Sequence, residues 1–67
     1  MTSVLLNGEP RELGVRATVA DAVAAAGAPD RGVAVAVDGE VVHRAAWEQT
    51  PLGDGQRIEV LQAVQGG

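Results

Sequence analysis

The sequence contains no cysteine and no lysine, and Trp47 is its only aromatic residue. Without cysteine the chain can form no disulfide, no thiolate metal site and no redox centre of the CxxC type, and it has no cysteine nucleophile. Without lysine, Schiff-base chemistry is left to the N-terminal amine alone. The shortage of aromatic residues argues against a platform on which nucleic acid bases stack. Any sulfur chemistry of this chain must therefore use a group other than its own thiol.

Positive charge and long apolar runs are also scarce. Five arginines stand against nine acidic residues, which gives a formal net charge of −4. This balance disfavours nucleic acid and anionic membranes as partners and allows docking on a basic protein surface. No uninterrupted apolar run exceeds five residues, and no basic segment followed by an apolar stretch opens the sequence. We therefore expect no membrane segment and a cytoplasmic location.

The apolar residues that are present indicate one small domain of 67 residues with an economical core, because 23 of them are Ala or Val. Alternation and helical periodicity predict an α+β domain over residues 1–64, in which one main helix crosses one face of a mixed sheet of four to five strands. Residues 65–67 are expected to form a flexible tail. The predicted elements are strands at residues 2–6, 11–13, 33–37, 40–43 and 57–64, a helix that follows Thr18, and an irregular or short helical segment at 44–52.

The register of the first hairpin has two readings. The Asn-Gly dipeptide at residues 7–8 suits the positive φ angles of a tight two-residue loop, which would place Val4 opposite Arg11. A four-residue loop from Asn7 to Pro10 would instead place Val4 opposite Leu13 on one face of the sheet. We favour the longer loop, because it pairs two apolar side chains. The Asp-Gly dipeptide at residues 38–39 predicts the second hairpin.

The helix has clear signals at both ends. Thr18 can cap the N–H groups of the first turn, and Asp21 adds negative charge there. Gly27 suits a left-handed C-terminal cap, and Pro29 prevents continuation. The stripe expected to face the sheet consists of Val19, Ala22, Val23 and Ala26. In the strand at residues 33–37, the valines are expected to face the helix and the alanines the other way.

The final two residues are the most informative candidate site. Gly66 and Gly67 can be read as an ordinary frayed end, or as an extended backbone that enters a narrow channel which any side chain would block. The terminal carboxylate is ionised at neutral pH and is no acyl donor until one oxygen becomes a leaving group. His43 has no Ser, Cys or second His nearby in the sequence to activate, so we expect no catalytic residue and no metal site.

The sheet face away from the helix is the second candidate site. Ala34 and Ala36 are expected there, together with Leu5 and Leu61. Such a smooth apolar surface can be a docking surface for a protein partner, or ordinary exposed apolar area on a small protein. Trp47 can anchor a partner or fill a core made of small residues, and we favour packing because it is the only large aromatic residue in a core of Ala and Val.

Taken together, these features resemble the ThiS family, the small sulfur carrier proteins of thiamine thiazole biosynthesis, which share the β-grasp fold of ubiquitin. The resemblance covers essentially the whole chain and is specific through the order and spacing of its parts. His43 departs from it, because many relatives carry Pro there. The matching features are the Asn7-Gly8 turn, the Thr18-Val19 helix start, the strand at 33–37 with its Asp38-Gly39 turn, the segment 41–44, Trp47, the Asp54-Gly55 turn and the ending Ala63-Val64-Gln65-Gly66-Gly67.

The resemblance implies a protein co-substrate and not an enzyme. A ubiquitin-activating-like adenylyltransferase would use ATP and Mg²⁺ to form an acyl-adenylate on Gly67, and the carrier itself would bind no cofactor. Sulfur from a persulfide donor would then replace AMP and give a C-terminal thiocarboxylate. Thiazole synthase would accept this sulfur. Gly66 and Gly67 would enter the partner active sites, while Leu5, Ala34, Ala36 and Leu61 would contact the activating enzyme.

Three other functions share parts of this pattern. The small subunit of molybdopterin synthase, or another ubiquitin-like sulfur carrier, would use the same ending for a different acceptor. A ubiquitin-like protein modifier would form isopeptide bonds with lysines of target proteins. A purely structural β-grasp binding module would not need the last two glycines.

Overall fold

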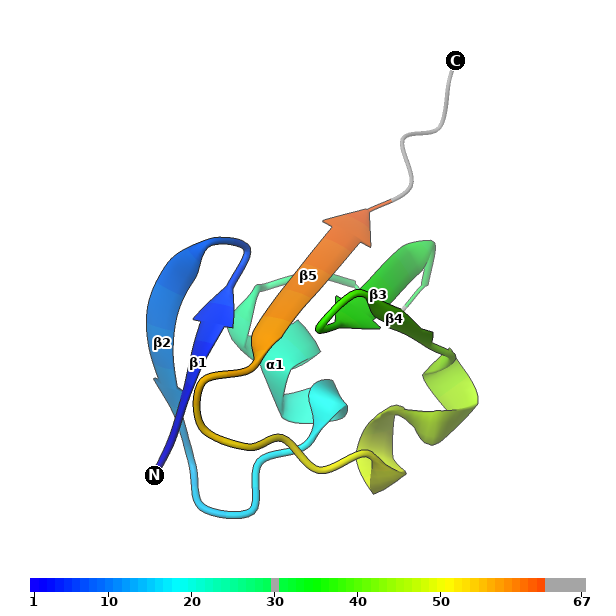
Figure 1. Cartoon of the computed structure of the whole chain (residues 1–67). Coiled ribbons are helices and arrows are strands. Elements are labelled where there is room, and N and C mark those ends of the chain that lie inside the picture. Colours follow the sequence, from blue (N-terminus) through cyan, green and yellow to red (C-terminus); the bar gives the residue numbers. More distant parts are fainter. Residues whose placement is uncertain (30, 63–67) are drawn as a thin grey trace.

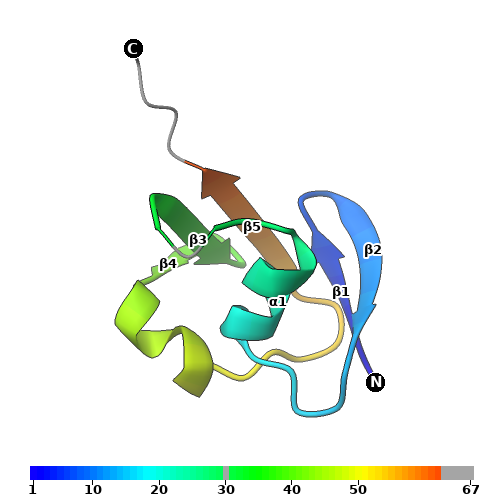
Figure 2. The ribbon, with the colours of Figure 1, turned by 180° about the vertical axis from the view of Figure 1, so that it is seen from behind.

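The computed structural model describes residues 1–29 and 31–62. Its strands form one five-stranded sheet in the order β2-β1-β5-β3-β4, and α1 packs across one face of it (Figures 1 and 2). Strands β1 and β5 are parallel, and the other neighbouring pairs are antiparallel. The predicted α+β architecture is confirmed. The elements are β1 (Thr2–Leu6), β2 (Glu9–Leu13), α1 (Val19–Ala25), β3 (Val33–Val37), β4 (Glu40–Val42), the 3-10 helix η1 (Arg44–Gln49) and β5 (Arg57–Gln62).

The first hairpin has the two-residue loop, so the favoured four-residue loop was wrong. Asn7 and Gly8 have φ angles of 52° and 84°, which is the left-handed conformation that a tight hairpin loop requires. Val4 consequently pairs with Arg11, and Leu13 pairs with Thr2. The expectation failed because β2 is an edge strand: Arg11 is exposed to solvent there and needs no apolar position. The preference of the turn therefore outweighed apolar pairing.

Helix α1 begins and ends where the sequence predicts. The Thr18 amide donates a hydrogen bond to an Asp21 carboxylate oxygen at 2.8 Å, which fixes the first turn. At the other end, the Gly27 amide donates to the Ala24 carbonyl and the Ala28 amide to the Val23 carbonyl. This is the double bond pattern of a Schellman motif, with Gly27 at a φ of 72°. Of the predicted stripe, Val19, Ala22 and Val23 are buried and Ala26 packs against the core.

The core lies between α1 and the sheet. Its most enclosed large side chains are Ile58 of the central strand, Val19 of the helix and Val35 of β3. Trp47 is buried as well, and its indole N–H donates to the Val42 carbonyl at 2.9 Å. The indole thus ties η1 to the end of β4, which supports the packing role over the role of an exposed anchor.

Candidate functional site

The open face of the sheet carries an apolar patch beside the end of β5. Leu61 is directly opposite Ala34, and Ala36 lies two residues further along β3. Val41 of β4 is opposite Ala36 and is 68% exposed. Residues opposite one another in neighbouring strands point to the same face. We call Ala34, Ala36, Val41 and Leu61 the apolar corner.

Val41 was missing from the predicted set, although the sequence held a signal for it. In the strand Glu40–Val42, two adjacent valines cannot face the same side of a sheet, because side chains alternate. Val42 packs against the core, so Val41 must point to the open face. Its exposure of 68% makes it comparable to Leu61, which is 65% exposed.

Leu5 lies on the open face but apart from the apolar corner. It pairs with Arg57 in the parallel β1–β5 ladder, four residues before Leu61. At about 3.3 Å per residue, this places it roughly 13 Å from Leu61 along the strand. The structure therefore brings together three of the four predicted contact residues and leaves Leu5 at the far end of β5.

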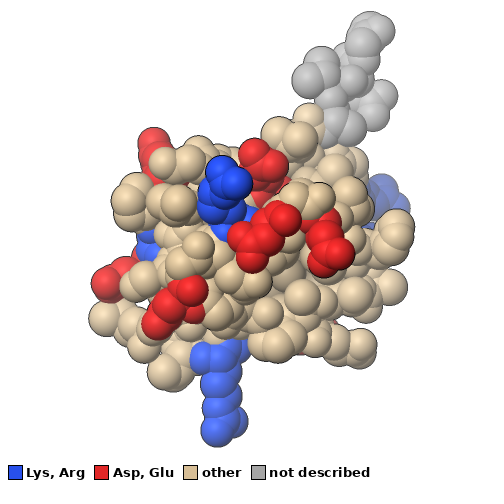
Figure 3. Space-filling model, in the orientation of Figure 1, with Lys and Arg blue, Asp and Glu red and all other residues tan. Residues whose placement is uncertain are grey.

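Charged side chains lie between Leu5 and the apolar corner. Arg57 and Glu59 alternate with buried residues of β5 and so point to the open face. Figure 3 shows this face, with acidic side chains gathered near the middle of the sheet around a basic one. A partner that fits this face needs an apolar patch at the apolar corner and a mainly basic surface next to it.

Side chains from the two hairpin turns hold the central strand near its two ends. Asp38 accepts hydrogen bonds from the Arg57 amide at 3.0 Å and from the Gln56 side chain at 3.1 Å. The hydrogen bond from the Arg57 amide is the main reason that the pKa of Asp38 lies below its ordinary value. Asn7 bonds both backbone groups of Val60, at 2.8 Å and 3.3 Å. The sequence showed only the turn-forming role of these two residues.

Gly66 and Gly67 lie outside the described residues, as does the predicted tail at 65–67. Strand β5 is described as far as Gln62, which pairs with Val33. Gln62 stands five residues before Gly67 in the sequence. The predicted strand at 57–64 is thus confirmed for its first six residues. The apolar corner includes Leu61, so it lies beside the last described part of the strand that leads to Gly67.

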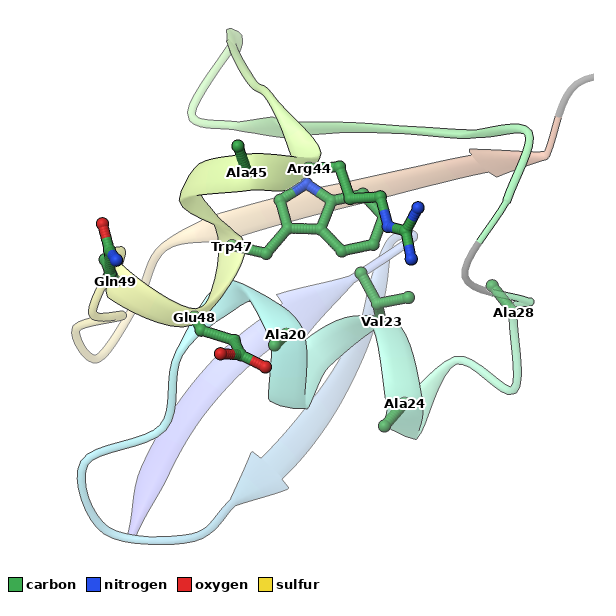
Figure 4. Close-up of a pocket in the computed structure, with 9 residues that line it drawn as sticks. All are labelled: Ala20, Val23, Ala24, Ala28, Arg44, Ala45, Trp47, Glu48 and Gln49. Atoms are coloured by element: carbon green, nitrogen blue, oxygen red, sulfur yellow. The ribbon is translucent and has the colours of Figure 1, made fainter.

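A hollow lies on the side of the molecule away from the open face, between α1 and η1 (Figure 4). Its volume is about 370 Å³, and small alanine side chains, Trp47, Arg44 and Glu48 are among its lining. The indole N–H of Trp47 is already bonded to Val42. Within residues 1–29 and 31–62, no group of three or more His, Cys, Asp or Glu side chains is placed to hold a metal ion. Nor does that part of the chain contain a helix long and apolar enough to cross a membrane.

The strand order, with a central β5 parallel to β1 and one helix across one face, defines a ubiquitin-like β-grasp protein. The open face, with its apolar corner and neighbouring charged side chains, lies along β5, the strand that precedes Gly66 and Gly67 in the sequence. The chain belongs to the ThiS family, whose sequence model matches residues 4–67.

A solved structure supports the same assignment. The crystal structure of the thiamine biosynthesis protein (ThiS) from Geobacter metallireducens is similar to this chain, with a TM-score of 0.77 and 29% sequence identity. The match covers 98% of this chain and 100% of that one. Among curated proteins, no significant match is found.

Proposed function

We propose that this protein is a sulfur carrier of thiamine biosynthesis whose Gly67 is adenylated, converted to a thiocarboxylate and used as the sulfur source of thiazole synthase. The observation that carries this proposal is the family match, which runs through Gly67 and spans residues 4–67. The similar crystal structure is that of a thiamine biosynthesis protein, which adds support.

The chemistry places every reactive group on Gly67 or on a partner. The Gly67 carboxylate attacks the α-phosphate of ATP, pyrophosphate leaves, and an acyl-adenylate forms in an adenylyltransferase that also holds the Mg²⁺. The terminal sulfur of a donor persulfide then attacks the acyl carbon and AMP leaves. A thiol cleaves the remaining S–S bond, which gives the thiocarboxylate and a disulfide. Adenylation is needed because a carboxylate oxygen is a poor leaving group, whereas AMP is a good one.

The residues of this chain suit the role of a substrate for another enzyme. The chain has no cysteine, so no thiol of its own can capture the acyl group. Two terminal residues without a Cβ let the backbone enter a narrow channel. The apolar corner and the charged middle of the open face supply a surface by which a partner can recognise the folded body.

Intact-mass spectrometry tests the proposal directly. The full chain is incubated with a ThiS-activating adenylyltransferase, ATP, Mg²⁺ and a persulfide donor, and the expected mass increase is that of one oxygen replaced by sulfur. A variant that lacks Gly67 should remain unchanged in mass. An unmodified wild-type chain, under conditions that convert a known carrier, would contradict the proposal.

The acceptor is tested separately. The thiocarboxylate form is offered to thiazole synthase and to the large subunit of molybdopterin synthase, and we expect turnover only with thiazole synthase. Turnover only with the second acceptor would reassign the carrier to molybdopterin formation. Isopeptide conjugates on target lysines, in the absence of thiocarboxylate, would show a protein modifier instead.

A further inference from the structure

Strand β5 continues beyond the point at which its neighbour β1 ends. The parallel ladder between them has its last strand pair at Leu6 and Ile58. The amides of Leu5 and Asn7 donate to the carbonyls of Gln56 and Ile58, at 2.9 Å and 2.8 Å. The backbone groups of every second residue of β5 therefore point toward β1. Val60 is the next residue in this series, but β1 ends at Leu6 and has no further strand residue whose backbone could bond to Val60.

The side chain of Asn7 takes the place of that missing strand residue. The Val60 amide donates to Asn7 Oδ1 at 2.8 Å, and Asn7 Nδ2 donates to the Val60 carbonyl at 3.3 Å. A carboxamide carries one acceptor and one donor in the same arrangement as a peptide group. The φ of 52° at Asn7 turns the backbone away into the hairpin, so only its side chain can reach Val60.

This contact decides how the last part of β5 is held. Among the described residues, Val60 is the last position of β5 bonded on the β1 side, whereas pairing with β3 continues to Gln62. Without the Asn7 side chain, the end of β5 would be bonded on one side only. Gly67 follows Val60 by seven residues, so the direction in which β5 leaves the sheet determines where the segment leading to Gly67 starts.

We propose that Asn7 is a positioning residue for the reaction at Gly67, acting through Val60 and the direction of β5. This inference rests on the proposed function. A β5 end held on both sides keeps most molecules in an arrangement from which Gly67 can enter the partner. When only a fraction of molecules has that arrangement, the apparent affinity falls by the same fraction. Chemistry inside the partner, once Gly67 is bound, is unaffected.

The second hairpin provides a matched control. Asp38 also begins a two-residue Asx-Gly turn, with a φ of 50°, and its carboxylate also bonds a backbone amide of β5. That amide belongs to Arg57, at the start of β5 and ten residues before Gly67. In both contacts a side-chain oxygen of the first turn residue accepts a hydrogen bond from a backbone amide of β5, and the two contacts hold different parts of that strand.

The test compares Asn7→Gly with Asp38→Gly in the full chain. Glycine accepts positive φ angles, so each turn is retained while the side-chain contact is lost. Adenylation is followed by pyrophosphate release at varied carrier concentration. For Asn7→Gly we expect KM for the carrier to rise about three- to tenfold with kcat unchanged, the range that loss of such hydrogen bonds produces. For Asp38→Gly we expect both constants to stay at the wild-type values.

Unchanged KM in Asn7→Gly, or an equal rise in both variants, would overturn the inference. Asn7→Asp serves as a second variant, because it retains the acceptor for the Val60 amide and loses the donor for its carbonyl; a KM between those of wild type and Asn7→Gly is expected. Amide hydrogen exchange of the free proteins gives a readout that does not need the partner. Faster exchange at Val60 in Asn7→Gly alone is expected. No difference between the variants at Val60 would contradict the role of the Asn7 side chain in holding β5, even if wild type is never adenylated.

Discussion

The two faces of the sheet are built from the same strands and differ in what covers them. On the face toward α1, Ile58 and Val60 of β5 are buried together with Val35 of β3. On the open face, the intervening residues of the same strands include Ala34 and Leu61, which are exposed. The side toward the helix therefore provides the stability of the fold, while the open side can change with little effect on folding and is available for recognition. Substitutions that separate stability from partner binding test this division.

The largest effect on stability is expected from Ile58→Ala. Ile58 is fully buried at the centre of the sheet, and removal of such a side chain destabilises a protein by about 2–5 kcal/mol. A domain of this size has a total stability of the same order. Urea unfolding followed by circular dichroism measures the change. Ile58→Val, expected to lose about 0.5–1.5 kcal/mol, keeps the comparison measurable if the alanine variant is unfolded.

The largest effect on binding is expected from Leu61→Asp. Leu61 lies in the apolar corner and is exposed, so unfolding should change by no more than about 0.5 kcal/mol. Burying the new carboxylate against an apolar partner patch should raise the Kd for the adenylyltransferase about tenfold or more. Val15→Asp is the control, since Val15 is also an exposed apolar residue but lies in the connection between β2 and α1. Equal Kd values for both variants, measured by calorimetry, would rule out the apolar corner as the docking surface.

A smaller effect on binding is expected from Glu59→Gln. Glu59 pairs with Ala36 on the open face, beside the apolar corner. Charges at the rim of an interface chiefly change the association rate and its dependence on salt. Stopped-flow measurement should show an association rate lower by about two- to threefold at low salt, with the difference shrinking as salt is added. Glu48→Gln, on the side of α1 and η1, should leave the rate unchanged.

The smallest effect is expected from Asp38→Asn and depends on pH. The pKa of Asp38 is lowered in the folded protein, mainly by the hydrogen bond from the Arg57 amide. Its contribution to stability is therefore complete above the ordinary pKa of about 3.9 and is lost as the pH falls through the lowered value. Thermal unfolding should show wild type more stable than the variant at about pH 6, with the difference shrinking as the pH is lowered below about 4. A difference that persists in acid would exclude the charged carboxylate as its source.

The covered face was predictable from the sequence because it depends on local patterns. Alternation in residues 33–37 and the spacing of Val19, Ala22 and Val23 reflect burial on one side, and the structure confirms both. Contacts that join distant positions were not predictable. Asn7 and Val60 are 53 residues apart, so nothing in the local pattern pairs them. The same holds for the displacement of Leu5 from Leu61, which follows from the β1–β5 register.

The first hairpin shows which local rule takes precedence when two conflict. The expectation for Val4 assumed that an apolar residue needs an apolar partner, whereas the Asn7-Gly8 dipeptide favoured the short loop. The turn decided the register. That register also brings Asn7 to the point where its side chain reaches Val60. Asn7 was predicted only to form the turn, and it also accepts a hydrogen bond from the Val60 amide.

The central claim is that sulfur is carried on Gly67 and delivered to the thiazole ring. The most direct test follows isotopically labelled persulfide sulfur through the complete reaction with adenylyltransferase, ATP, Mg²⁺ and thiazole synthase. We predict that the label is found first in the mass of the C-terminal peptide of this chain and then in the thiazole product. Labelled thiazole formed equally well with a chain that lacks Gly67 would contradict the account.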